Sequence, residues 1–394
     1  MSIIAGDQYW DDIRRHYFDS RSINLNPGSV GTTSSVVRNV RVELESEEVY
    51  ANPIRLYELA RVSYNHIVNV SREIWSSEGY IQAVLPSASQ MINIICLNVM
   101  RRLRKGNHAP FKVFTSAFEH EGGIGPFLHL PEFAVEIVPD QILNEDRLLR
   151  HLLGKEKPDI IFISHVRYAD GIMPNIESIA HTVKDVVPNA IFILDAAQSL
   201  GIHSLPFGLV DVIFGSTHKW LFGPHGGGLA WFKLNFCQWI EGIFWTGNGL
   251  FNNNVHGYFD MPGGQSFSLY KEISVSLDLY QSTGPLAIFN RSCLLCKYAR
   301  KRMIGLFEEY GIHFDIISDE FSPMFSVSLR RLDAYPLYKY LICLGVSIKY
   351  IKDYTYNGSL INIIRFGFPY YESISRIEAV IEYIRRYLHD ISLD

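Results

Sequence analysis

In the middle of the chain, short apolar runs alternate with segments in which apolar residues recur every three or four positions. Buried strands are predicted at residues 159–165, 190–195, 212–216 and 228–233. A helix is predicted at 174–185, with Pro174 near its start. Near-continuous apolar strands separated by amphipathic helices are typical of a mostly parallel sheet covered on both faces. We therefore predict an α/β fold with a mostly parallel central sheet flanked by helices.

The pattern changes near residues 282–285, Ser-Thr-Gly-Pro. A long amphipathic helix passes through Cys293 and Arg302, and strands are predicted at 325–329, 346–350 and 362–365. The closing segment 373–388 carries its aliphatic residues on one helical face. These elements predict a smaller α+β domain.

Composition narrows the class of protein. The 394 residues are 47% hydrophobic, which is enough for a large core, and the net charge of −5 gives no basic footprint for nucleic acid. The chain contains no apolar run of the roughly 18 residues that a membrane helix needs, and its start lacks the basic-then-apolar pattern of a signal peptide. We expect a soluble, cytoplasmic protein with neither nucleic acid nor membrane as a partner.

The five cysteines, an odd number, fit a reducing compartment. Cys293 and Cys296 form a single C-x-x-C inside a segment with helical periodicity. Because no second cysteine pair or H-x-H accompanies them, we expect core packing and no metal site.

The candidate chemistry lies where two predicted strands end. Asp195 ends one strand, and Lys219 follows the next in the run Ser-Thr-His-Lys-Trp. In open α/β sheets, ligands bind at the carboxyl ends of strands. A lysine amine whose pKa is lowered condenses with an aldehyde, and a nearby carboxylate can keep a pyridinium nitrogen protonated. Together the two residues predict a pyridoxal phosphate (PLP) site; separately they predict only a surface lysine and a helix cap.

These residues carry a resemblance to the class V aminotransferase family of fold-type I PLP enzymes, which includes cysteine desulfurases and isopenicillin N epimerase. Residues 195–198, Asp-Ala-Ala-Gln, resemble the family's D-x-A-Q, and residues 216–219, Ser-Thr-His-Lys, resemble its S-x-H-K. The resemblance covers nearly the whole chain. It implies that Lys219 forms a Schiff base with PLP and that Asp195 pairs with the ring nitrogen. It also implies that Gln198 bonds the phenolic oxygen, while Ser216 and His218 hold the phosphate.

Two further segments match the family at the phosphate. Residues 85–93 resemble its G-T-T-E-x-I-N segment, with Ala88 and Ser89 at the phosphate-binding positions, although a serine N-cap explains this pattern equally well. Residues 262–266, Pro-Gly-Gly-Gln-Ser, stand where the family has a G-T motif that reaches the partner's cofactor. Gly264 lacks the usual hydroxyl, so only its N–H could serve. The resemblance still implies a homodimer.

The resemblance assigns His120, in Phe-Glu-His-Glu-Gly-Gly, to stacking on the pyridine ring and to a catalytic role. A histidine bonded to the backbone is the alternative. Tyr168 stands where desulfurases carry an asparagine near the phenolic oxygen. It could donate to that oxygen or reach the substrate.

Recognition of a substrate carboxylate calls for an arginine fork, and Arg365 lies between apolar residues of a predicted strand. It matches the family's late arginine. Asn26 and Gly28, in Asn-Pro-Gly-Ser, resemble the substrate-side segment of the epimerase-like branch. The resemblance also places the helix around residues 9–14 with the small domain, so we predict a large PLP-binding domain at 22–283 and a small domain of 1–21 and 284–394.

The reaction class depends on a cysteine. Desulfurases carry a reactive cysteine on a loop ahead of the late arginine, whereas residues 345–365 contain none. Cys343 is nearest, but it lies in an apolar helical segment and we expect it in the core. We therefore expect chemistry at Cα of an L-amino acid or amino-acid conjugate without a cysteine persulfide: β-elimination of the C–S lyase type, or transamination. An epimerase or a cysteine desulfurase is the alternative.

Overall fold

The computed structural model describes residues 7–45, 52–106, 110–237, 266–320, 322–330, 332–356 and 358–392. The chain divides into two compact units. The large unit comprises residues 36–168 and 173–282, and the small unit comprises residues 1–35, 169–172 and 283–394. A short loop that follows a strand of the large unit thus belongs to the small unit.

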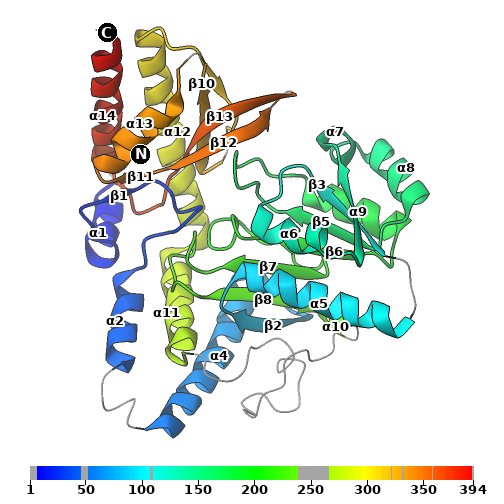
Figure 1. The fold of residues 1–394 in the computed structure, drawn as a ribbon. Coiled ribbons are helices and arrows are strands. Elements are labelled where there is room, and N and C mark those ends of the chain that lie inside the picture. Colours follow the sequence, from blue (N-terminus) through cyan, green and yellow to red (C-terminus); the bar gives the residue numbers. More distant parts are fainter. Residues whose placement is uncertain are drawn as a thin grey trace. The chain divides into compact units, whose positions relative to one another are not determined.

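The large unit is built around a seven-stranded sheet in the order β2-β8-β7-β6-β5-β3-β4 (Figure 1). Its strands are β2 (Tyr80–Leu85), β3 (Phe111–Ser116), β4 (Phe133–Val138), β5 (Ile160–Ser164), β6 (Ile191–Asp195), β7 (Val212–Ser216) and β8 (Gly228–Lys233). Neighbours from β4 to β7 are parallel, whereas β8 runs antiparallel to both β7 and β2. The predicted mostly parallel sheet is confirmed.

Helices cover this sheet. Those in or entering the large unit are α2 (Ser35–Leu44), α4 (Pro53–Trp75), α5 (Ala88–Gly106), α6 (Glu121–His129), α7 (Asp140–Leu143), α8 (Asp146–Glu156), α9 (Ile176–Val186), α10 (Leu234–Cys237) and α11 (Ser268–Thr283). Met91 and Ile95 of α5 and Phe127 of α6 pack in one core cluster with Phe162 and Phe214 of the sheet. The strands are apolar on both faces because helices bury both, as the continuous apolar runs predict.

The small unit contains an antiparallel sheet in the order β12-β13-β10-β9. Its elements are α1 (Asp7–Tyr17), β1 (Ile23–Asn24), α12 (Pro285–Glu309), β9 (Phe314–Ile316), β10 (Met324–Leu329), α13 (Ala334–Cys343), β11 (Val346–Ser347), β12 (Lys349–Tyr356), β13 (Ser359–Gly367) and α14 (Ile374–Ser392). Strands β1 and β11 form a separate parallel pair. A smaller α+β unit is therefore present, as predicted.

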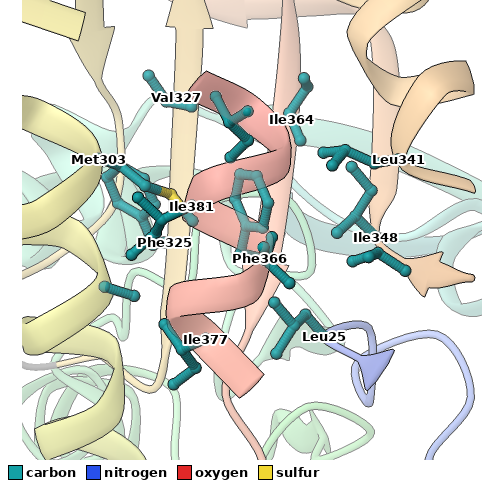
Figure 2. Close-up of a cluster of buried hydrophobic side chains, with 14 of the residues drawn as sticks. Leu25, Met303, Phe325, Val327, Leu341, Ile348, Ile364, Phe366, Ile377 and Ile381 are labelled. Carbon is teal, nitrogen blue, oxygen red and sulfur yellow. The ribbon is translucent and has the colours of Figure 1, made fainter. Parts of the chain in front are cut away.

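The core of the small unit lies between its sheet and helices α12, α13 and α14 (Figure 2). Phe325 of β10 and Phe366 of β13 stack with their centroids 6.1 Å apart. Ile377 and Ile381 of α14 belong to the same cluster, one helical turn apart. Each such side chain contributes about 1.5–3 kcal/mol by leaving water.

The predictions for the cysteines have different outcomes. Cys296 is buried in the small unit's core, whereas Cys293 is partly exposed. Cys343 is exposed, so its predicted place in the core is wrong. The buried residues of α13 include Leu337 and Leu341, and Cys343 lies two positions after Leu341, which turns it about 200° away from that stripe. Within the described residues, no group of three potential metal ligands occurs and no helix is both long and apolar enough to cross a bilayer.

Candidate active site

Three neighbouring strands of the large unit end in polar residues. Ser164 ends β5, Asp195 ends β6 and Ser216 ends β7. Ser164 and Asp195 are register partners, and the three strands run parallel. Their side chains therefore gather at one edge of the sheet, the edge at which α/β sheets bind ligands.

Lys219 lies on the loop that joins β7 to the antiparallel β8, and it is partly buried. The loop is held by its own hydrogen bonds. The hydroxyl of Thr217 donates to the carbonyl oxygen of Pro224 at 3.0 Å, and the backbone of Thr217 bonds to Gly223 and Gly227. Because the backbone is fixed on both sides of Lys219, the loop presents the amine from a defined position.

A second set of contacts joins this loop to the turn after β6. The indole N–H of Trp220, which is fully buried, donates to Oε1 of Gln198 at 3.0 Å. Gly201 has φ of +92°, and a Cβ there would lie 2.5 Å from the backbone nitrogen of Leu221. Only glycine permits this approach. The two turns that carry Asp195 and Lys219 are thus packed backbone to backbone.

Asp195 is almost fully buried, with 7% of its surface exposed. Its Oδ1 accepts a hydrogen bond from the backbone N–H of Ala197 at 2.8 Å. Burial raises the pKa of Asp195, and the positive charges of Lys219 and His120 oppose that rise. A Cβ on Gly123 would lie 3.1 Å from Oδ2 of Asp195, so this glycine keeps the space beside the second oxygen open.

His120 is the N-cap of α6: its Nδ1 accepts a hydrogen bond from the backbone N–H of Gly122 at 3.0 Å. The ring is exposed and meets the ring of Tyr168 edge to face, with centroids 5.0 Å apart. The backbone bond given as the alternative for His120 therefore exists, and the ring also contacts that of Tyr168. The two aromatic side chains define one wall of the candidate site.

The start of α5 lies beside the end of β7. The backbone N–H of Ala88 donates to Oγ of Ser216 at 3.4 Å, and Oγ of Ser89 lies 3.0 Å from the position of a Cβ on Gly122. The pKa of His218 is lowered to about 4 by burial and by Lys219 and His225, so the imidazole is neutral near pH 7. Its Nδ1 is buried and has no hydrogen-bond partner among the described residues.

Glu119 had no predicted role, yet it joins this group. Its two carboxyl oxygens accept hydrogen bonds from the hydroxyls of Ser116, at 2.6 Å, and of Ser164, at 2.5 Å. Burial raises the pKa of Glu119 to about 7, and the like charge of Asp195 adds to the rise. The signal that could have found Glu119 is its position in the sequence, directly after a strand that ends at the same edge of the sheet.

The predicted substrate residues lie together in the small unit. Arg365 of β13 is 2% exposed and donates through Nη2 to Oδ1 of Asn26 at 2.7 Å and to Oγ of Ser29 at 3.1 Å. Gly28 lies in the turn that carries both acceptors. Both acceptors are neutral oxygens, an amide oxygen and a hydroxyl oxygen.

The structure thus forms two groups of predicted residues. One group lies in the large unit at the strand ends: Ala88, Ser89, His120, Tyr168, Asp195, Gln198, Ser216, His218 and Lys219. The other lies in the small unit: Asn26, Gly28 and Arg365. Gly264 and the segment around it lie outside the described residues.

The large-unit group fits PLP. The N-terminus of α5 contacts Ser216, and His218, two residues further along, has a buried imidazole nitrogen without a partner among the described residues, so both could supply donors for a phosphate. A buried carboxylate with open space beside Oδ2 provides a place for a ring nitrogen that carries a proton. The loop amine of Lys219 provides the nucleophile for the aldehyde.

Solved structures share this fold. A cysteine desulfurase from Thermococcus onnurineus NA1 matches with a TM-score of 0.79, covering 96% of this chain and 98% of that one at 15% identity. The cystine C–S lyase C-DES, solved with its product cysteine persulfide, matches with a TM-score of 0.72, covering 94% and 98% at 16% identity. Identities this low show the fold alone, and the fold is that of fold-type I PLP enzymes.

The comparison of the sequence with family models shows which family the chain belongs to. Residues 44–258, more than half of the chain, match the model of the aminotransferase class-V family. The chain belongs to that family and is a PLP-dependent, class-V aminotransferase-like enzyme.

Two curated relatives differ in their named activity. A putative cysteine desulfurase, PbSufS, from Plasmodium berghei is 22% identical over 232 residues, which are 55% of this chain and 42% of the relative. Alanine–glyoxylate aminotransferase 1 from Saccharomyces cerevisiae is 21% identical over 222 residues, 55% of this chain and 53% of the relative. The aligned segment spans about half of each relative. Together with the structural matches, these names support the cysteine desulfurase alternative better than the main expectation of C–S lyase-type β-elimination or transamination.

Proposed function

We propose that this protein uses PLP to break the C–S bond of a sulfur-containing L-amino acid by β-elimination. The observation that supports the proposal most is the loop amine of Lys219 fixed beside the turn that carries the buried Asp195. Bound PLP supplies an electron sink for the bonds at Cα of an amino acid. The C–S lyase and desulfurases among the structural neighbours support a substrate whose sulfur lies on Cβ, next to that carbon.

Lys219 would bind the aldehyde carbon of PLP, and its Nζ is the base that would accept the proton from Cα of the substrate. Asp195 would hold a proton on the ring nitrogen, because its carboxylate is buried and has space beside Oδ2. His120, whose ring contacts that of Tyr168, would stack on the pyridine ring. Gln198 accepts a hydrogen bond from Trp220 and so fixes the turn, and its amide would bond the phenolic oxygen of PLP.

The phosphate would be held by the start of α5 and by the loop after β7. Ser216 and the backbone of Ala88 already contact each other, and Ser89 lies next to the start of α6. His218, neutral near pH 7, donates or accepts through a buried Nδ1. Gly264 of a second protomer is a further candidate donor, and the homodimer this requires stays a prediction.

Arg365 is proposed to bind the α-carboxylate of the substrate. It is buried and donates to Asn26 and Ser29, and its planar guanidinium can bind a carboxylate through two parallel hydrogen bonds. Gly28 lies in the turn that carries these acceptors. Tyr168, which lies beside His120, is proposed to contact the side chain of the substrate and so to determine which substrates bind.

Cysteine desulfurase is the second candidate, and two observations favour it. Desulfurases recur among the structural neighbours and the relatives. Cys343, which was expected in the core, is exposed on α13. A desulfurase needs an accessible thiol to accept the sulfur, and Cys343 meets that minimal requirement.

The products separate the two candidates. β-Elimination converts cysteine and water into pyruvate, ammonia and hydrogen sulfide. A desulfurase transfers the sulfur atom to a protein thiol and releases alanine. With cysteine and cystine as substrates, we expect pyruvate and ammonia in equal amounts, and little alanine, from the purified protein.

A variant with Cys343→Ser tests the thiol directly. We expect it to keep wild-type turnover, as should the control Cys293→Ser at a partly exposed helix position. Alanine as the main product, lost in the Cys343→Ser variant and kept in the control, would replace our proposal by the desulfurase. A keto acid formed from a sulfur-free amino acid would replace it by transamination.

A further inference from the structure

The buried arginine of the small unit is held by one turn of the chain, residues 26–29. Nη2 of Arg365 donates to Oδ1 of Asn26 at 2.7 Å and to Oγ of Ser29 at 3.1 Å. The backbone N–H of Ser29 donates to the carbonyl oxygen of Asn26 at 3.0 Å, which closes the turn. Both acceptors of Nη2 thus belong to one short hydrogen-bonded unit, and the shape of that unit determines where Nη2 lies.

Asn24, two residues before the first acceptor, joins the two ends of this turn through its side-chain amide. Its Oδ1 accepts a hydrogen bond from the backbone N–H of Asn26 at 2.9 Å. Its Nδ2 donates to the carbonyl oxygen of Val30 at 2.9 Å and to Oγ1 of Thr32 at 3.2 Å. Because the amide group is planar and rigid, these bonds fix the distance between the residue that begins the turn and the residue that follows it.

The backbone at Asn24 is also fixed relative to the strand that carries the arginine. Asn24 ends β1, which pairs in parallel with β11. The next residue, Leu25, is fully buried, and its carbonyl oxygen accepts a hydrogen bond from the N–H of Gly367 at 2.7 Å. Gly367 ends β13, two positions after Arg365. The residue that closes the turn and the arginine that the turn holds are therefore joined through the backbone as well.

We propose that Asn24 is a positioning residue of the substrate site: by closing the turn of Asn26 and Ser29, it holds the guanidinium of Arg365 in the orientation that binds the α-carboxylate. An arginine side chain has several rotatable bonds, and ordering it at the moment of binding costs affinity. A bidentate bond to a carboxylate also needs the guanidinium plane in a defined orientation. This inference rests on the proposed role of Arg365, and all of these residues belong to the small unit.

The test compares two ligands that differ in charge, with the purified full-length protein in its PLP-bound form. Methylthiopropionate is a carboxylate with sulfur on its β-carbon and no amino group, and methylthiopropanamide is the corresponding uncharged amide. Calorimetric titration measures the affinity of each. We expect Asn24→Ala to weaken binding of the carboxylate about three- to tenfold, the cost of ordering one long side chain, and to leave the affinity for the amide unchanged.

Asn362→Ala is the matched control. Asn362 is also a partly buried residue of the small unit, and its Oδ1 accepts a hydrogen bond from the backbone N–H of Asp353 at 3.1 Å. It lies on β13 three positions before Arg365, so its side chain points to the opposite face of the sheet. This variant should bind both ligands as the wild type does. An equal loss of carboxylate affinity in the control would overturn the inference, because the effect would then come from a general loosening of the unit.

Two further outcomes would also overturn the inference: an Asn24→Ala variant that binds the carboxylate as tightly as wild type, or one that loses affinity equally for both ligands. The proposed function is tested separately with Arg365→Ala. If the wild type binds the carboxylate no better than Arg365→Ala does, the role of Arg365 itself fails, and the inference fails with it.

Turnover of cysteine provides an independent check. Asn24→Ala should raise KM by a similar factor and change kcat less than about twofold, because the carboxylate is bound alike in the ground state and the transition state. In an Arg365→Ala background the same substitution should have no further effect on kcat/KM, because the residue through which Asn24 acts is gone. Additive losses would contradict an action through Arg365.

Asn24→Ser keeps the test open if Asn24→Ala does not fold. A serine hydroxyl can accept the N–H of Asn26, two residues on, but it is too short to replace the bonds to Val30 and Thr32. The affinity of this variant for the carboxylate should fall by less than in Asn24→Ala, and its affinity for the amide should stay at the wild-type value. Wild-type affinity for both ligands would contradict the inference.

Discussion

At the scale of single residues, the site depends on where buried charges are placed. Asp195 and Asp211 are both carboxylates whose pKa is raised by burial. They lie at opposite ends of neighbouring strands: Asp195 ends β6, whereas Asp211 precedes β7 and accepts a hydrogen bond from the backbone N–H of Phe192. Asp195 has the Lys219 loop beside it, whereas Asp211 has Lys233 at the end of β8, so Asp211 is a matched control at the other end of the strands.

Asp195→Asn should leave PLP bound but suppress turnover. A neutral amide cannot keep the ring nitrogen protonated, so we expect kcat to fall roughly 10²–10³-fold, the size of losing one strong electrostatic partner. Asp211→Asn should stay close to wild type in kcat. Steady-state kinetics with cysteine, alongside the PLP content of both variants, provides the measurement. Near wild-type kcat in Asp195→Asn would assign the ring nitrogen to another residue.

At the same scale, sequence reasoning located Asp195 and Lys219 because each follows an apolar run that could only be a strand. It gave no role to Glu119, although the Glu-His pair had been singled out for His120. The hydroxyls that bind Glu119 come from two strands 48 positions apart, at Ser116 and Ser164. Contacts of this kind depend on how neighbouring strands are aligned with each other, and that register cannot be determined from a single sequence.

At the scale of elements, the packing of two turns positions the amine. The turn after β6 and the loop after β7 meet at Gly201, where the Trp220–Gln198 bond reinforces the contact. The sequence shows the strands on both sides but not this meeting of turns. It also shows no sign that β8 runs antiparallel, because an apolar run looks the same in either direction.

Gly201→Ala tests this packing against Gly208→Ala. Both glycines have positive φ, +92° and +87°, but a Cβ at Gly201 would lie 2.5 Å from backbone while one at Gly208 meets nothing within 4 Å. We expect a loss of unfolding free energy of about 1 kcal/mol for Gly208→Ala, from backbone strain alone, and of more than about 3 kcal/mol for Gly201→Ala. Urea unfolding of both proteins measures the difference. Equal losses would show that the close approach does not fix the loop.

At the scale of the whole molecule, the two units contribute different chemistry. The large unit gathers the residues proposed for PLP, and the small unit buries Arg365 with Asn26 and Ser29. The pattern of apolar residues predicted both units, because a strand buried on both faces is apolar throughout, whereas an element buried on one face is apolar only at periodic positions. Cys343 escaped the same reasoning, because an apolar helix end does not show which of its faces is covered. The cytoplasmic location stays a prediction.

The central claim is that Lys219 carries the cofactor, and one measurement tests it most directly. Borohydride reduction of the purified protein, followed by peptide mapping, should place a phosphopyridoxyl group on Lys219. The label and the visible absorption should disappear in Lys219→Ala and remain in the control Lys233→Ala, a lysine at the end of β8 that donates to the carbonyl oxygen of Gly208. A label on any other lysine, or visible absorption that survives in Lys219→Ala, would contradict the assignment.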